Sequence, residues 1–383
     1  MYSLQDYGEM IADFERVQAY NKAIGSAIRP GDTALELGCG PGIFALLASR
    51  AGARRVYAID YAPIVGLARQ LAAANGLGER IQFFEADSRK IELPERVNVI
   101  ISDVRGALPL FAHAVSTVED ARVRFLVPNG TMIPQRDILK AAVVEAETTY
   151  KKLISPWTTS LPGVDLRDAI APLLNNEFYH LHFAADQLLT EPQSWCVLNY
   201  QEGATSRAMA DLHFVVRRNG TAHGICLWFE ARLFGECGYS TGPGTSKGGI
   251  SGQMFLPWPN EVHVISGQAL EIGLKADLIG ESYVWQWETH IPAWGTQPEQ
   301  HFRQSSLNGA QLSPQSLRRR AADFVPALSE SGQADRWLLG AIDGKTSLQE
   351  IAQSAAQRFP KIFPRWEDAL TRAAELADQF SRR

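Results

Sequence analysis

Three glycines at alternate positions, Gly38, Gly40 and Gly42, have the spacing in this chain that most directly indicates chemistry. Glycine lets a backbone turn tightly and approach a ligand where a Cβ atom would collide. Asp60 ends the next apolar run, about 20 residues later. Its carboxylate can accept hydrogen bonds from both hydroxyls of a ribose. Together these residues predict a site for a nucleoside cofactor.

The spacing of the glycines indicates which cofactor this is. Residues 36–42 read E-x-G-x-G-x-G, which differs from the G-x-G-x-x-G fingerprint of dinucleotide-binding turns. This stretch resembles the signature of class I methyltransferases, which bind S-adenosylmethionine. The resemblance implies that Glu36 helps to hold the amino end of the cofactor, Asp60 its ribose and Asp87 its adenine amino group.

The elements that must position these residues alternate between strand and helix. Apolar runs predict strands at 33–37, 55–59, 80–84 and 97–101, and periodicity predicts helices that include 43–51 and 62–75. This alternation is typical of a doubly wound parallel (Rossmann-like) sheet, so we predict an α/β domain over residues 1–136. Gly38, Asp60, Asp87 and Asp103 then fall just past strand ends, where such sheets bind ligands.

The sequence pattern changes after Pro134. Short alternating runs predict an antiparallel, barrel-like β-domain over 137–305, which contains a helical insertion at 155–192. Residues 306–383 are predicted to form a small helical domain. A cluster at strand spacing in the β-domain comprises Tyr283, Trp285, Trp287, Glu288 and His290. It either lines an acceptor pocket or forms the domain core.

Composition excludes several classes of protein. The formal net charge of −5 over 383 residues provides no basic footprint for nucleic acid. The four cysteines lack C-x-x-C pairing and metal-ligand spacing, so we predict no metal site and reduced thiols in a cytoplasmic protein. There is no long apolar stretch and no signal peptide, and we expect no membrane association.

Residues 5–292 resemble the protein arginine methyltransferases. Residues 7–16 are similar to the helix that covers the cofactor in that family, which implies that Met10 packs on the sulfur and Arg16 pairs with the cofactor carboxylate. An ordinary amphipathic helix is the alternative. Residues 93–102, 124–134 and 239–243, with His223-Gly224 and Trp228-Phe229, match further parts of the family pattern. In that family the insertion forms a dimer arm, so 155–192 is predicted either to make a homodimer or to be a compact decoration.

The acceptor loop departs from the family pattern. Arginine methyltransferases hold the guanidinium between two glutamates, whereas Asp103 replaces the first here and Ala112 the second, and Arg105 adds a positive charge. Opposite unit charges at ~4 Å interact by about 4 kcal/mol near a protein surface, so such changes can decide the substrate class. The family's Thr-His-Trp loop is also missing, and residues 247–253 occupy its place.

Three residues of this loop are candidates for catalysis. Asp103 either orients or deprotonates the acceptor, or caps the strand. Arg105 either binds a substrate carboxylate or pairs with a neighbouring acid. His113 either acts as a general base or is an ordinary helix histidine.

The C-terminal residues 335–383 resemble the peptide-binding modules of the PqqD type, on the stretch Ile342-Asp343-Gly344 followed by Ser347-Leu348 and Glu350-Ile351. The same residues also fit a plain capping box in a structural appendage.

The predicted function is an S-adenosylmethionine-dependent methyltransferase acting on a specialised acceptor: an amino acid, a peptide or another small natural-product intermediate. The alternatives are an arginine N-methyltransferase, which could draw a second carboxylate from Glu119 or elsewhere, and a non-catalytic binding scaffold of the same architecture.

Overall fold

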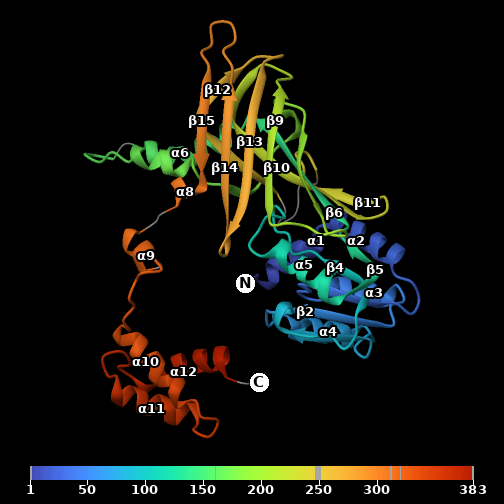
Figure 1. Ribbon diagram of the computed structural model, residues 1–383, viewed down its shortest axis with the longest axis vertical. Coiled ribbons are helices and arrows are strands. Elements are labelled where there is room, and N and C mark those ends of the chain that lie inside the picture. Colours follow the sequence, from blue (N-terminus) through green and yellow to red (C-terminus); the bar gives the residue numbers. More distant parts are fainter. Residues whose placement is uncertain (1, 160, 246–251, 311–312, 320, 382–383) are drawn as a thin grey trace. The chain divides into compact units, whose positions relative to one another are not determined.

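The computed structural model describes residues 2–159, 161–245, 252–310, 313–319 and 321–381. The chain falls into two compact units, Met1–Ala310 and Gln311–Arg383, each with its own core (Figure 1).

The first unit begins with two helices and a five-stranded parallel sheet. The helices are α1 (Leu4–Ala12) and α2 (Phe14–Ala27). Asp13 separates them, because it ends α1 and caps α2 through its side chain. The strands are β1 (Thr33–Leu37), β2 (Arg55–Asp60), β3 (Ile81–Glu85), β4 (Val97–Ser102) and β5 (Leu126–Ile133).

The sheet has the order β3-β2-β1-β4-β5, so the direction of winding reverses between β1 and β4. All five residues of β1 are buried, as expected for a central parallel strand. The connecting helices are α3 (Ile43–Arg50), α4 (Val65–Ala74) and α5 (Ala114–Phe125), with the short 3₁₀ helix η1 at Ser88–Lys90. This confirms the doubly wound α/β prediction, and the predicted strands match to within a residue or two.

Two antiparallel sheets follow, as predicted for the β-domain. One has the order β7-β12-β10-β6-β8, from Phe178–Leu181, Gln253–Val264, Gly220–Phe234, Arg136–Val144 and Gln193–Asn199, and β11 (Cys237–Ser240) pairs with β10. The other has the order β15-β14-β13-β9, from Gln300–Ser305, Ser282–Ile291, Ala269–Ile279 and Arg207–Val215. Side chains from both sheets and from the parallel sheet form one continuous core.

The aromatic residues of β14 belong to this core. Tyr283, Trp285 and Trp287 are buried, while Glu288 and His290 lie on the opposite face of the strand and pair with charged neighbours. The alternation therefore reflects a sheet with one buried face, which confirms the core interpretation over an acceptor pocket.

The insertion between β6 and β8 forms an arm that projects from the β-domain (Figure 1). It contains α6 (Glu147–Thr158), η2 (Arg167–Ala169), α7 (Ile170–Leu173) and η3 (Ala185–Gln187). The structure differs from the predicted helical range, because α6 begins before residue 155 and β7 joins the sheet beside β12. A short helix, α8 (Ser306–Gly309), closes the first unit.

The second unit consists of α9 (Pro314–Arg319), α10 (Glu330–Ala341), α11 (Leu348–Arg358) and α12 (Trp366–Phe380). Ser347 and Glu350 form a capping box at the start of α11. Leu338, Ile351, Phe363 and Leu376 lie in its small core. The described residues of this unit form helices and the loops between them, without a strand. Peptide binding by this unit stays a prediction.

Within the described residues, no helix is long and apolar enough to cross a membrane. The same residues contain no group of three or more His, Cys, Asp or Glu side chains arranged to hold a metal ion.

Candidate functional site

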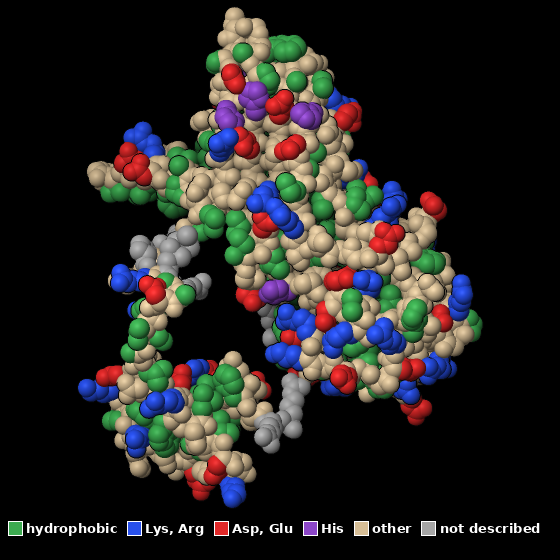
Figure 2. All heavy atoms as spheres, in the orientation of Figure 1, with side chains coloured by type: hydrophobic (Ala, Val, Ile, Leu, Met, Phe, Trp, Pro, Cys, Tyr) green, Lys and Arg blue, Asp and Glu red, His purple; other side chains and the backbone are tan. Residues whose placement is uncertain are grey.

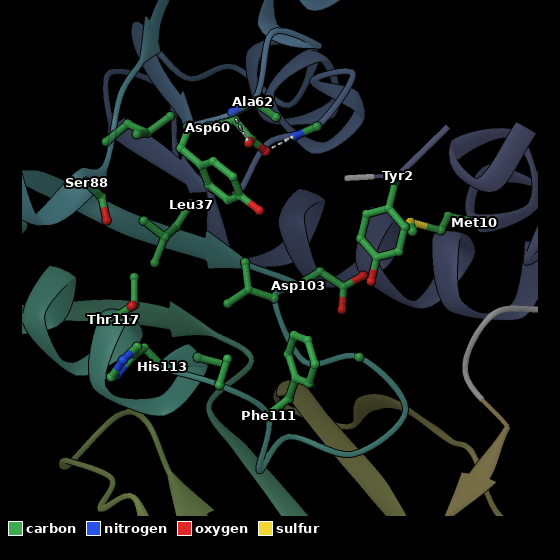
Figure 3. A pocket seen from close by; sticks show the side chains of 18 of the residues that line it. Tyr2, Met10, Leu37, Asp60, Ala62, Ser88, Asp103, Phe111, His113 and Thr117 are labelled. Atoms are coloured by element: carbon green, nitrogen blue, oxygen red, sulfur yellow. Dashed lines mark hydrogen bonds between the residues drawn. The ribbon is translucent and has the colours of Figure 1, made fainter. Parts of the chain in front are cut away.

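A cavity of about 890 Å³ lies at the carboxyl edge of the parallel sheet, next to the point where the strand order reverses. Six of the predicted cofactor residues line it: Met10, Arg16, Gly38, Gly40, Asp60 and Asp87. Figure 3 shows Tyr2 and Met10 at one end of the cavity, Ser88, Thr117 and His113 at the other, and Asp103 between them.

The glycine turn forms the base of this cavity. Gly38 and Gly40 have φ angles of +69° and +50°, in the region that favours glycine. A Cβ atom on Gly38 would lie 2.3 Å from Val104 Cγ1, and one on Gly40 would lie 2.8 Å from the Tyr7 ring. Gly42 does not line the cavity, because it caps α3 with a φ of +78°. It shapes the turn from which α3 begins.

Asp60 lies at the end of β2 with its carboxylate held by the backbone. Its Oδ2 accepts from the Gly40 amide at 2.8 Å, and its Oδ1 accepts from the Ala62 amide at 2.9 Å (Figure 3). Each oxygen retains a lone pair for a further donor. The side chain is therefore oriented in advance and still able to accept from ribose hydroxyls.

Glu36 does not line the cavity, which corrects its predicted place in the cofactor site. The side chain is 3% exposed, and its oxygens accept from the backbone amides of Phe44 (3.3 Å) and Ala45 (2.7 Å). Burial raises the pKa of this carboxyl to about 8. Glu36 thus binds the unpaired amides at the start of α3 and fixes the glycine turn from behind.

Asp87 lines the cavity near its Ser88 end and forms a bidentate pair with Arg89, at 3.0 and 2.9 Å. This pair lowers the pKa of the Asp87 carboxyl. The side chain remains a quarter exposed, so it can still accept from another donor.

The N-terminal helices supply the opposite wall. Met10 lies on α1, and Arg16 extends from α2 into the cavity. The Arg16 guanidinium donates to the Met10 carbonyl and to Asp103 Oδ2, and its Nε lies 3.6 Å from Asp13. Arg16 therefore lies between the two helices and the loop that follows β4.

Arg105 does not point into the cavity, which corrects its predicted role as a ligand for substrate. It is 4% exposed and lies behind the wall formed by Phe229 and Tyr239. Its Nη1 donates to Asp137 Oδ1 at 2.7 Å, and its Nη2 donates to Asp103 Oδ1 at 2.8 Å. The structure therefore shows the other alternative, in which Arg105 pairs with neighbouring acids.

Asp103 lines the cavity and accepts from both arginines and, at 3.3 Å, from the Tyr20 hydroxyl. With its oxygens engaged in this way, it suits an orienting role better than proton abstraction. His113 lies at the Ser88 and Thr117 end of the cavity (Figure 3), and its Nε2 is 3.0 Å from Glu281 at the tip of the β13–β14 hairpin.

Of the two residues considered at the position of the second carboxylate, Ala112 lines the cavity and Glu119 does not. Ala112 lines the cavity with a φ of +40°, an unusual backbone for alanine, at the position of the family's second glutamate. Glu119 does not line the cavity and pairs with Arg122, so it supplies no second carboxylate. Residues 247–251, from the region in place of the Thr-His-Trp loop, lie outside the described residues.

The aromatic lining of the cavity was not among the features predicted from the sequence. It comprises Tyr2, Tyr7, Tyr61, Phe111, Phe229 and Tyr239. These residues come from five separate parts of the chain and share no spacing that could have revealed them. Tyr7 alone carried a signal, since it begins the stretch that resembles the family's cofactor-covering helix.

The residues of the cavity fit S-adenosylmethionine. Glycines at 38 and 40 are required because added Cβ atoms would collide with Val104 and Tyr7, and Asp60 has free lone pairs at the strand end. Arg16 supplies a cation inside the cavity. The other charged residues that line it are Asp13, Asp60, Asp87, Asp103 and Arg89. The lining is therefore net negative, which suits a positively charged ligand.

Comparisons with known proteins agree with this geometry. A family model described as a methyltransferase domain matches residues 34–130. The chain is 27% identical over 266 residues to the probable protein arginine N-methyltransferase 6 of Arabidopsis thaliana, across 67% of this chain and 60% of that protein. It is 28% identical to the protein arginine N-methyltransferase 1 of Schizosaccharomyces pombe, across 61% of this chain and 71% of that protein.

Solved structures share the fold. The PRMT1 enzyme–prozyme heterotetrameric complex of Trypanosoma brucei with AdoHcy superposes with a TM-score of 0.71 at 20% identity, across 78% of this chain and 96% of that one. The protein arginine methyltransferase 10 of Arabidopsis thaliana gives a TM-score of 0.69 at 22% identity, with the same coverage. The chain thus has the architecture of arginine methyltransferases over most of its first unit.

Proposed function

We propose that this protein is an S-adenosylmethionine-dependent methyltransferase of the arginine methyltransferase type. The observation that carries the proposal is the single cavity in which the glycine turn, the oriented Asp60 and the Arg16 cation meet at the switch point of the parallel sheet. The match of residues 34–130 to a methyltransferase domain supports it.

Each cavity residue has a distinct task under this proposal. Asp60 would accept from the ribose, Arg16 would bind the carboxylate, and Asp87 would accept from the adenine amino group. Gly38 and Gly40 let the backbone of the turn pack against Val104 and Tyr7, where a Cβ atom would collide. When bound, the cofactor supplies an electrophilic methyl group on a sulfonium. The protein then contributes mainly positioning and exclusion of water.

For the acceptor, we propose an arginine side chain of a protein in place of the specialised amino acid, peptide or natural-product intermediate predicted from sequence. The curated relatives are named as arginine methyltransferases, and the net negative, aromatic lining suits a guanidinium. Asp103 is the carboxylate in the position of the family's first glutamate. The site differs from the family because Ala112 provides no second carboxylate.

Calorimetry with S-adenosylhomocysteine tests the cofactor claim. We expect binding by the native chain and a loss of at least tenfold in affinity for Asp60→Asn, because hydrogen bonds to a charged group contribute about 1.5–3 kcal/mol. Asp186→Asn, a change at an exposed aspartate outside the cavity, is the control and should bind as the native protein does. Absence of binding at millimolar ligand would refute the proposal.

Transfer of a labelled methyl group tests the acceptor. Arginine-rich polypeptides incubated with labelled S-adenosylmethionine and then hydrolysed should yield methylarginine. Label in another amino acid would keep the methyltransferase and reject arginine. Cofactor binding without any transfer, including to a cell extract, would favour the non-catalytic scaffold.

We also propose that the chain forms a homodimer through its arm. Trp157, Leu161 and Val164 leave apolar side chains exposed on the arm, and Leu4 and Phe14 do so on the N-terminal helices. Large contiguous patches of exposed apolar side chains mark interaction surfaces, and the arm carries three such side chains between residues 157 and 164. Light scattering should give twice the chain mass for the native protein, and Trp157→Ser with Leu161→Ser should give the monomer mass. An unchanged mass in the variant would exclude the arm.

A further inference from the structure

Arg105 belongs to a buried chain of alternating charges that ends in the cavity. The order is Arg16, Asp103, Arg105, Asp137, and the Tyr200 hydroxyl then donates to Asp137 Oδ2 at 2.9 Å. Asp137 is fully buried. The chain of contacts therefore runs from α2 through the loop after β4 to strand β6 of the β-domain.

The Arg105 guanidinium is held on every side. Besides the two carboxylates, it donates to the hydroxyls of Tyr20 and Tyr239, both at 2.6 Å. Its Cζ atom lies 5.1 Å from the centre of the Phe229 ring. A buried, planar group with this many partners has one available orientation. Arg105 is thus a fixed point behind the cavity wall.

Arg105 fixes the orientation of the Asp103 side chain. Asp103 lies in an irregular segment between β4 and α5, so no ladder of backbone hydrogen bonds positions it. Arg105 binds Oδ1, with a second contact from Nε at 3.3 Å. A carboxylate is planar, so fixing Oδ1 also fixes Oδ2. Oδ2 is the atom that receives the Arg16 guanidinium.

We infer that Arg105 is a positioning residue for the amino-acid end of the cofactor site. Arg105 orients the Asp103 carboxylate. Asp103 in turn orients the Arg16 guanidinium so that it can bind a ligand carboxylate. The inference rests on the proposed function, since it assigns Arg16 to the carboxylate of S-adenosylmethionine. Supporting residues of this kind keep a binding group within the narrow range of useful geometry.

A pair of ligands separates this role from general structural support. S-adenosylhomocysteine carries the amino-acid carboxylate, whereas 5′-methylthioadenosine keeps the adenosine and lacks that group. For Arg105→Lys we expect affinity for S-adenosylhomocysteine to fall about tenfold or more, because one ammonium cannot replace the planar fork. Affinity for 5′-methylthioadenosine should stay within about twofold.

A charge-balanced variant guards against failure to fold. Arg105→Gln with Asp137→Asn leaves no unpaired charge in the interior and should show the same selective loss. Arg122→Lys, which alters a bidentate pair with Glu119 outside the cavity, should change neither affinity.

Equal weakening of both ligands, or no change in either, would overturn the inference. Failure of the native protein to bind S-adenosylhomocysteine would instead refute the proposed function.

Discussion

Arg105 and Asp137 place opposite charges in the interior of the first unit, in the loop after β4 and on strand β6. Burial raises the pKa of the Asp137 carboxyl and alone would lower that of Arg105, but Asp137 holds the arginine pKa well above its usual value. Each charge is tolerated only because the other is present, since removing one partner leaves a buried ion unpaired.

Arg105→Met should lower the free energy of unfolding by about 3–5 kcal/mol, because it leaves the Asp137 carboxylate without a cation. Adding Asp137→Asn should restore most of this loss. Urea unfolding followed by tryptophan fluorescence measures both effects. A double variant that loses the sum of two independent costs would show that the pair is not coupled.

Glu36 should make stability depend on pH. Its folded-state pKa of about 8 lies above its unfolded value, so the folded protein binds this proton more tightly. Stability should therefore fall as pH rises from about 4.5 to about 8 and then level off. Relative to Glu36→Gln, the native protein should lose unfolding free energy across this window. Parallel pH profiles of the two proteins would contradict the assignment.

At the scale of elements, the turn between β1 and α3 is shaped by contact with the loop after β4. Gly38 sits against Val104, and Gly40 sits against Tyr7 of α1. The turn therefore depends on side chains from both neighbouring elements as well as on its own glycines.

Gly38→Ala should disrupt cofactor binding, because its Cβ would lie 2.3 Å from Val104 Cγ1. Val104→Ala in the same chain removes that atom and should restore part of the affinity for S-adenosylhomocysteine. Recovery should be incomplete, since an alanine at φ +69° remains strained. Calorimetry on both variants decides, and full loss in the double variant would place the cost in the backbone alone.

The parallel sheet was predictable from sequence because buried strands such as 33–37 leave apolar runs and their ends carry Gly38 and Asp60. The partners of Arg105 could not be predicted from the sequence. Asp137, Tyr200 and Tyr239 are distant in the chain and meet only through tertiary packing. The prediction that Glu36 lies in the cofactor site differs from the structure for a related reason. Its position before the glycines is the same whether its side chain faces a ligand or the amides of α3.

The whole molecule consists of two units with separate cores. The second has its own apolar cluster, including Leu338 and Ile351 on α10 and α11. All of the described residues that line the cavity belong to the first unit.

A chain ending at Ala310 should bind S-adenosylhomocysteine with the affinity of the full chain, because it keeps the whole cavity and its core. Calorimetry on the two proteins measures this. If the shorter chain folds but binds more weakly by tenfold or more, the C-terminal unit contributes to cofactor binding. Methyl transfer that fails only in the shorter chain would assign the unit to the acceptor.

The short length of helix α1 bears on how long a ligand stays in the cavity. It has nine residues and none is buried, although Tyr7 lies over the glycine turn and Met10 lines the cavity. An isolated helix of this length is marginal in water, so α1 depends on what it covers. A ligand that packs beneath Tyr7 and Met10 would hold α1 folded, and its departure would leave the helix free to unwind. We therefore expect the residence time of the spent cofactor to depend on how fast α1 opens.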